Sequence, residues 1–158
     1  MILIEKEVEK IFRKNRNKVY KFIGHKKTTD NFELDKAGKN FIGKNFIGVF
    51  SQDNIPIKTI KRNKYFIFNT DTSDLEGTHW CAGYFSSKGV FYIYDTYGRN
   101  TDKILPILTK QILGFGGSYV ESDKDPEQIG TKSSHCGQSS ISWLMCVKQL
   151  GIRNALKI

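Results

Sequence analysis

Two dense apolar runs, separated by a short polar turn, constrain the fold of this chain more than any other feature. The runs are HWCAGYF at 79–85 and VFYIYDTY at 90–97, with SSKG between them. Aromatic residues at this density favour strands, and so short a turn between two such runs is typical of a β-hairpin. Because polar residues rarely interrupt the runs, we expect a sheet that is buried on both faces.

The rest of the chain predicts an alternation of further strands and helices. Short apolar runs, or runs in which apolar and polar residues alternate, indicate strands, whereas a spacing of three to four residues between apolar positions indicates helices. In the first half of the chain we expect a basic amphipathic helix at 4–22, a loop through 23–48 that leads into a strand at 46–50, a strand at 64–70 and a polar loop at 70–77. After the hairpin we expect a helix at 102–113, which Pro106 shortens or kinks, a strand at 117–122 and a loop at 122–135. The last expected element is a buried helix at 136–150 that Gly151 caps.

Length and composition limit the class of protein. A chain of 158 residues suits one domain, which we divide into a basic N-terminal region (1–40) and a core (41–150). With 39% hydrophobic residues the chain can bury a core, and no apolar run is long enough to span a bilayer. The N-terminus lacks the pattern of a secretory signal. We therefore expect a monomer that is neither secreted nor bound to a membrane.

The three cysteines predict a reducing compartment, because Cys81, Cys136 and Cys146 cannot all pair with one another. At least one free thiol therefore needs an explanation. The sequence has neither a CxxC pair nor a Cys/His cluster with zinc spacing, so we predict no metal site.

The positive charge lies entirely in the first part of the chain. Residues 1–64 carry 16 Lys and Arg against 7 Asp and Glu, whereas residues 65–158 carry 9 of each kind. A basic region of this size favours a polyanion such as DNA. The alternative is a Lys-rich solvated face with no partner. For the basic helix at 4–22, packing on the domain and binding of DNA both remain open.

Cys136 is the candidate nucleophile because it stands where a polar loop passes into a helix. Unpaired N–H groups and the positive end of the helix dipole stabilise a thiolate at such a position. Gly137 follows directly and would let a substrate backbone approach closely. A small buried hydrophobic role, which is usual for a lone cysteine, suits Cys146 better, since Cys146 lies in mid-helix.

His79 is the candidate general base, and Asp95 is the candidate group that orients it. The two residues fall at the same open end of the predicted hairpin, where cross-strand neighbours lie about 5 Å apart. We expect Asp95 to accept a hydrogen bond from one ring nitrogen and to leave the other nitrogen facing the sulfur. The alternative is a histidine at a strand end and an aspartate that forms a turn. Gln128, in the loop before Cys136, could donate to an oxyanion.

The order of these residues resembles the adenovirus maturation protease, adenain, and its clan, which includes SUMO proteases. The similarity runs from about residue 41 to 150 and rests on four segments taken together. These are FIGVFSQDNIP (46–56), IFNTDTSDLEGTHW (67–80), VFYIYDTYGR (90–99) and QIGTKSSHCGQSS (128–140).

The resemblance implies an α+β fold with a central mixed sheet flanked by helices and the nucleophile at the start of a buried helix. It also implies roles for four residues: Cys136 as nucleophile, His79 as base, Asp95 as the orienting acid and Gln128 as oxyanion donor. Trp80 would pack beside the site and contact substrate; the alternative is that Trp80 is only a residue of the hydrophobic core. Gln128 stands one residue further from the cysteine than in adenain, and the adenain cysteine that links to a peptide cofactor has no match here.

The function that the resemblance implies is cleavage of viral capsid or core precursor proteins, at sites that contain glycine. Such an enzyme would act in the virion and in the host cytoplasm or nucleus. It would need no cofactor that the sequence reveals, although the basic region is compatible with DNA as an activating polyanion. Two alternatives are an isopeptidase that removes ubiquitin-like modifiers and a basic, non-catalytic nucleic-acid-binding virion protein.

Overall fold

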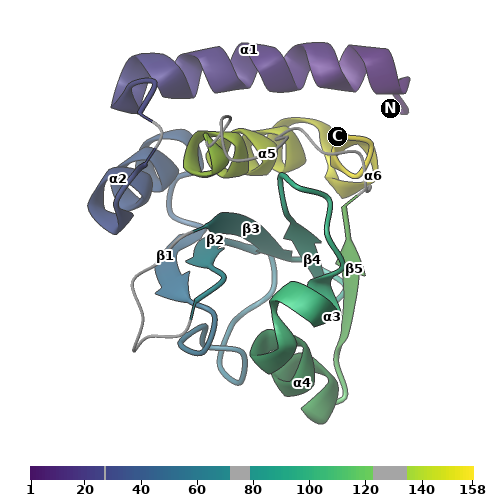
Figure 1. The fold of residues 1–158 in the computed structure, drawn as a ribbon. Coiled ribbons are helices and arrows are strands. Elements are labelled where there is room, and N and C mark those ends of the chain that lie inside the picture. The colour runs from purple at the N-terminus through teal and green to yellow at the C-terminus, as the bar shows by residue number, and fades with distance from the viewer. Residues whose placement is uncertain (27, 72–78, 123–134) are drawn as a thin grey trace.

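The chain folds into a five-stranded mixed sheet with helices on both faces (Figure 1), which confirms the α+β class. The structure is a computed structural model and describes residues 1–26, 28–71, 79–122 and 135–158. The strands are β1 (Phe46–Ser51), β2 (Lys64–Asn69), β3 (Trp80–Phe85), β4 (Val90–Tyr94) and β5 (Ser118–Glu121). The helices are α1 (Glu5–Ile23), α2 (Asn31–Phe41), α3 (Thr101–Ile104), α4 (Pro106–Gly114), α5 (Cys136–Leu150) and α6 (Ile152–Ala155).

The strands lie in the sheet in the order in which they occur in the chain. β1 and β2 are parallel, as are β4 and β5, whereas β3 pairs antiparallel with both β2 and β4. The predicted hairpin is confirmed as β3 and β4, with Ala82 opposite Tyr94. Because β3 and β4 are antiparallel neighbours, the residue before β3 and the residue after β4 emerge at the same end of the sheet.

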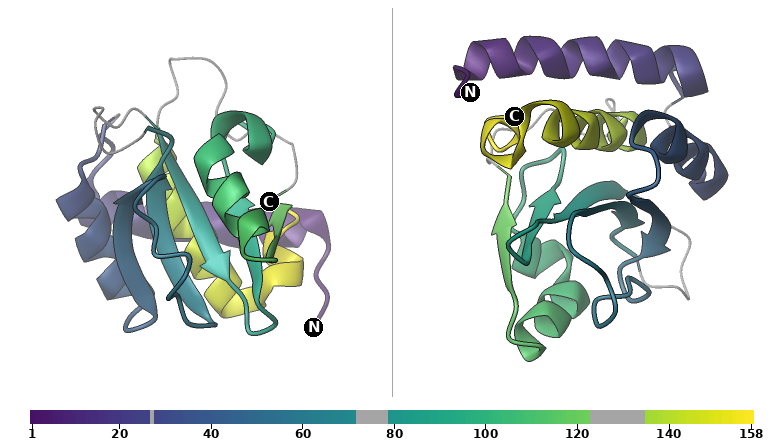
Figure 2. Two further views of the ribbon diagram at one scale, coloured as in Figure 1. Left: turned by 90° about the horizontal axis from the view of Figure 1, so that it is seen from below. Right: turned by 180° about the vertical axis from the view of Figure 1, so that it is seen from behind.

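The helices form layers on either side of the sheet (Figures 1 and 2). α5 lies against one face and α1 lies across the outer side of α5, while α3 and α4 cover the other face. Each face has its own apolar core: Trp143 and Leu144 belong to the core under α5, and Phe66 and Phe68 to the core under α4. This confirms a sheet buried on both sides.

The predicted N-terminal helix is confirmed, and its apolar stripe packs on the domain. Val8, Phe12 and Val19 are buried against α5, whereas Ile4 and Phe22 at its two ends are exposed. The Lys residues of α1 and Arg13 are exposed, whereas Arg16 is half-buried and its guanidinium lies over the Phe12 ring. Whether this outer face binds DNA remains a prediction.

The loop predicted through 23–48 is wrong for its middle part, which forms α2. Asp30 caps this helix: its side chain accepts the backbone N–H of Glu33, and the Glu33 side chain accepts the backbone N–H of Asp30. This reciprocal capping box stabilises a helix start even in a stretch rich in Gly, Lys and Asn. The strand expected after it is confirmed as β1.

The other predicted strands and helices follow the predicted boundaries closely, whereas most of the loops predicted at 70–77 and 122–135 lies outside the described residues. Pro106 occupies the first position of α4 and separates it from the short α3, as a residue without a backbone N–H can do. α5 spans 136–150 and ends at Gly151, whose positive φ of 84° terminates the helix. No helix among the described residues combines the length and the apolar character that crossing a bilayer requires.

Candidate active site

Cys136 is the first residue of α5, as the sequence predicted. The residue is 7% exposed, and its sulfur accepts the backbone N–H of Trp80 at 3.4 Å. α5 is 15 residues long, so its unpaired N-terminal amides and its dipole both favour negative charge on this sulfur. Cys136 therefore lies where the fold can stabilise a thiolate.

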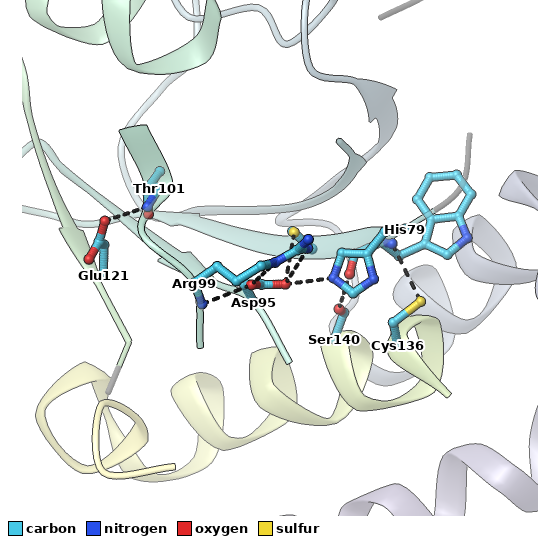
Figure 3. Close-up of polar contacts among 9 residues, drawn as sticks. His79, Asp95, Arg99, Thr101, Glu121, Cys136 and Ser140 are labelled. Atoms are coloured by element: carbon cyan, nitrogen blue, oxygen red, sulfur yellow. Dashed lines mark hydrogen bonds and ion pairs between the residues drawn. The ribbon is translucent and has the colours of Figure 1, made fainter. Parts of the chain in front are cut away.

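His79 and Asp95 meet at the end of the sheet nearest to Cys136. Nε2 of His79 lies 2.6 Å from Oδ1 of Asp95, and both side chains are buried. Figure 3 shows the imidazole ring between the Asp95 carboxylate and Cys136. Because a carboxylate only accepts hydrogen bonds, Nε2 must donate, and Nδ1 remains available to the thiol. The structure thus brings the three residues together with the ring orientation that we expected.

Arg99 is a fourth member of this cluster that the sequence analysis missed. Its Nε donates to Oδ2 of Asp95 at 2.9 Å and its Nη2 to Oδ1 at 3.2 Å, while its backbone N–H donates to Oδ2 at 3.1 Å. The tight turn after β4, in which the N–H of Gly98 donates to the Asp95 carbonyl, brings Arg99 back onto the carboxylate. A basic residue four positions after the acid, across a glycine, is the sequence signal that could have indicated it.

The electrostatics of the cluster favour the charged forms of His79 and Asp95. Burial opposes the imidazolium, but hydrogen bonds with Asp95, Cys136 and Cys81 outweigh burial and raise the pKa of His79. Burial also opposes the carboxylate, but hydrogen bonds from His79 and Arg99 and their positive charges hold the pKa of Asp95 below its usual value. An imidazole whose charged form is favoured in this way readily takes the proton of a neighbouring thiol, which leaves an imidazolium beside a thiolate.

The other two cysteines are less suited to chemistry. Cys81 and Cys146 are fully buried free thiols, and burial raises the pKa of each to about 11. His79, Cys81 and Asp95 place potential metal ligands within 4.8 Å of one another. However, both Asp95 oxygens already accept hydrogen bonds, and a raised thiol pKa disfavours the thiolate that a metal would require. We therefore assign these side chains to the cluster itself and not to a metal centre.

Trp80 and Gly137 both contact the segment that joins α1 to α2, which we name the connector (residues 24–30, all described except residue 27). The Trp80 indole donates to the carbonyl of Thr29 at 3.0 Å. A Cβ at Gly137 would lie 2.3 Å from Oγ1 of Thr29 and 2.9 Å from Leu34. The absent side chain of Gly137 therefore lets the connector pack on α5, and approach of a substrate backbone to Gly137 remains a prediction.

The connector also binds the first turn of α5 through its carbonyl groups. Nε2 of Gln138 donates to the carbonyls of Gly24 and Lys26 at 3.2 and 2.9 Å. Nε2 of His135 lies 2.9 Å from the carbonyl of His25. The connector and the start of α5 are thus joined by three hydrogen bonds.

A groove of about 800 Å³ opens beside the cluster. The connector, the first turn of α2, the ends of β1 and β2, and Trp80 line this groove. Trp80, which helps to line this groove, also donates its backbone N–H to the Cys136 sulfur, so one residue of the groove wall contacts the candidate nucleophile. Its walls are largely polar, and an ion pair of 2.6 Å between Lys26 and Glu33 lies in one of them.

Gln128, the predicted oxyanion donor, lies outside the described residues, so its position relative to Cys136 is not established. The described residues place a thiol, an imidazole and a carboxylate side by side, with the imidazole hydrogen-bonded to the carboxylate, which is a chemical basis for acyl transfer. No protein-family model and no curated protein matches this chain.

Proposed function

We propose that this protein is a cysteine protease in which Cys136 is the nucleophile, His79 the general base and acid, and Asp95 the residue that orients His79. The observation that carries the proposal is the His79 imidazole, held by Asp95 through Nε2 and placed beside a cysteine at the start of a helix. This arrangement matches the requirement for an activated nucleophile, a base within reach and a third group that fixes the base.

The chemistry follows from these positions. Nδ1 of His79 takes the Cys136 proton, and the thiolate attacks the carbonyl carbon of the scissile bond. As the C–N bond of the tetrahedral intermediate breaks, His79 gives the proton to the leaving amine, and a thioester remains on Cys136. Water then attacks the thioester with His79 again as base, which releases the acid and restores the thiol.

The oxyanion of the intermediate needs donors near the Cys136 sulfur. The backbone N–H of Cys136, at the start of α5, is one donor that the fold supplies. We propose Gln128 as the second donor, in keeping with its place in the resemblance to adenain. Loss of one such donor typically lowers the rate about 100- to 1000-fold.

We propose viral capsid or core precursor proteins as substrates, cut next to glycine. Support comes from the resemblance to adenain, whose fold and site the proposal extends to this chain. Further support comes from the groove that Trp80 helps to line, since a groove of this volume can receive an extended peptide. The same groove could receive the C-terminal tail of a ubiquitin-like modifier, which is why an isopeptidase remains the alternative.

Co-expression of the protein with the capsid precursor of its source virus tests the proposal directly. We expect mass spectrometry to find a defined cut that is absent with Cys136→Ala. Incubation with ubiquitin-like conjugates is the parallel arm. Cleavage of conjugates but not of the precursor would replace the protease by the isopeptidase, and no Cys136-dependent cleavage of either substrate would contradict both.

The exposed basic face of α1 supports a second candidate function, binding of nucleic acid. Lys10, Lys14 and Lys18 recur every four residues and are all exposed on this helix. Such a stripe can contact successive phosphates of DNA. The two functions are compatible, because the three lysines are exposed and lie outside the buried stripe of α1.

A further inference from the structure

Asp95 is shared between two cations, which a simple Cys–His–Asp site does not require. His79 and Nη2 of Arg99 both donate to Oδ1, while Nε and the backbone N–H of Arg99 donate to Oδ2. Asp95 is 4% exposed, whereas the Arg99 side chain is 42% exposed. The arginine thus reaches from the solvent to the buried carboxylate and covers both of its oxygens.

Asp95 is the group near His79 that sets how strongly the imidazolium form is stabilised. Among the described residues, the titratable groups around the ring are Cys81 from β3, Cys136 from α5, and Asp95, Tyr97 and Arg99 from the segment after β4. Asp95 is the only acid in this set. The Tyr97 ring lies 5.0 Å from the His79 ring and 4.7 Å from the Arg99 guanidinium, so it contacts both cations.

A general base that must also act as an acid needs an intermediate affinity for its proton. Asp95 favours the imidazolium, which helps His79 to take the proton of Cys136. If Asp95 stabilised the imidazolium too strongly, however, His79 would not give the same proton to the leaving amine. A second cation on the carboxylate weakens the attraction between Asp95 and the imidazolium.

We propose that Arg99 is a positioning residue that orients Asp95 and limits how strongly Asp95 holds the protonated His79, so that His79 can release its proton to the leaving group. The proposal rests on the proposed function for its catalytic meaning, but the interaction itself can be measured without a substrate. The proton that His79 receives from the Cys136 thiol leaves with the amine when the C–N bond breaks, and His79 ends neutral beside the thioester.

Replacement of Arg99 by methionine tests the electrostatic part. Arg99→Met keeps the backbone N–H that orients Asp95 and removes the guanidinium, whereas Arg99→Lys keeps the charge. The readout is an NMR titration of the histidine side chains, in a Cys136→Ala background because a thiol and an imidazole in contact titrate as a coupled pair. The chain has three histidines, so His79→Gln assigns the signal and His25 and His135 are internal controls.

We expect Arg99→Met to move the His79 titration about one pH unit upward, the lower end of the range for a nearby charge, because the arginine is partly exposed. Arg99→Lys should titrate close to the unsubstituted chain. An unchanged or lowered titration in Arg99→Met would overturn the proposal. If the titration rises and yet no Cys136-dependent cleavage of any substrate is found, the proposed function fails while the effect of Arg99 on His79 stands.

The catalytic part has its own test in the active enzyme. p-Nitrophenolate leaves an ester without needing a proton, whereas an amine does not leave an amide readily without one. Arg99→Met should therefore slow hydrolysis of an amide substrate more than hydrolysis of the matching p-nitrophenyl ester, and Arg99→Lys should restore the ratio. Equal slowing of both substrates would contradict a role in proton release.

Discussion

Cys136 differs from the other two cysteines in its surroundings, and this difference predicts a selective reaction. The sulfur of Cys136 lies at the start of α5 beside His79, whereas burial raises the pKa of Cys81 and Cys146 to about 11. We expect iodoacetamide at pH 6 to modify one thiol per folded chain, and peptide mapping to place it at Cys136. In His79→Gln the reaction should be at least about tenfold slower, because no imidazolium stabilises the thiolate. Equal rates in both proteins would remove His79 from the site.

Asp95 predicts how stability depends on pH. Its pKa is lowered by folding, so its contribution to stability is present above the unfolded value of about 3.8 and is lost as the pH falls through the lower folded value. The pKa of His79 is raised, so its contribution is complete below about 6.5 and is lost as the pH rises through the higher folded value. We therefore expect the unsubstituted chain to exceed Asp95→Asn in stability most between about pH 4 and 6.5, by roughly 2 kcal/mol.

Thermal unfolding of both proteins from pH 2 to 9 measures this difference. The comparison cancels the general effect of acid on a chain with a net charge of +9. A difference in melting temperature that stays constant through this range would show that the His79–Asp95 pair is not charged in the folded protein.

Spacing along the chain was enough to predict that His79 and Asp95 meet, because they belong to one hairpin whose register is local. The contact of Cys136 with this pair joins residues that are 57 positions (His79) and 41 positions (Asp95) apart in sequence, so hairpin register does not report it. Residue chemistry suggested this contact, and the resemblance to adenain strengthened the prediction. Arg99 was missed because its role depends on a turn geometry after β4 that no periodicity reports. Gln128 remains a prediction.

At the scale of elements, the connector joins the N-terminal region to α5 through hydrogen bonds. Gly137→Ala should disturb this contact, since the new Cβ would lie 2.3 Å from Oγ1 of Thr29. We expect a loss of about 1–3 kcal/mol in the free energy of unfolding, the usual cost of overpacking. Alkylation of Cys136 should slow as well, because Thr29 also binds Trp80.

The matched control for this substitution is Gly114→Ala in α4. A Cβ there meets nothing within 4 Å, so alanine should leave stability unchanged or raise it slightly. Equal unfolding free energies for the two variants, measured by urea denaturation, would mean that the connector yields freely and does not support α5.

The elements also show where periodicity fails as a guide. α1 and α5 are long enough for their apolar spacing to indicate a helix, and both follow the predicted ranges. α2 is shorter, and its sequence mixes helix-disfavouring Gly38 with charged residues, so its composition indicated a loop. The capping pattern Asp30-x-x-Glu33 was the local signal for this helix and outweighs composition.

At the scale of the whole molecule, the sequence predicted which segments form strands better than it predicted how the strands pair. The antiparallel pair β3–β4 follows from a four-residue turn, whereas the parallel pairs β1–β2 and β4–β5 depend on crossovers whose path local patterns do not encode. The mixed character of the sheet came from the resemblance to adenain. The position of α1 over α5 likewise depends on packing between distant segments.

The charge asymmetry of the whole molecule predicts a DNA-binding face on α1. Replacement of Lys10, Lys14 and Lys18 by glutamate should weaken binding to a short duplex at least about 100-fold at low salt, because three phosphate contacts are lost and three repulsions are introduced. The slope of log K against log salt should shrink by about 2.7, which is 0.9 for each lost contact. Fluorescence anisotropy over a range of salt concentrations measures both quantities.

A control variant of the same net charge separates a defined face from the general charge of the chain. Lys88, Lys103 and Lys110 are exposed, and they belong to the part of the chain with no net charge. Their replacement by glutamate lowers the net charge equally but leaves α1 intact, so DNA affinity should fall much less than in the α1 variant. Long-range attraction to DNA depends on the total charge of the protein, whereas counterion release depends on local contacts with phosphates. Equal losses of affinity in the two variants would therefore mean that total charge accounts for DNA binding and that α1 is not a binding face.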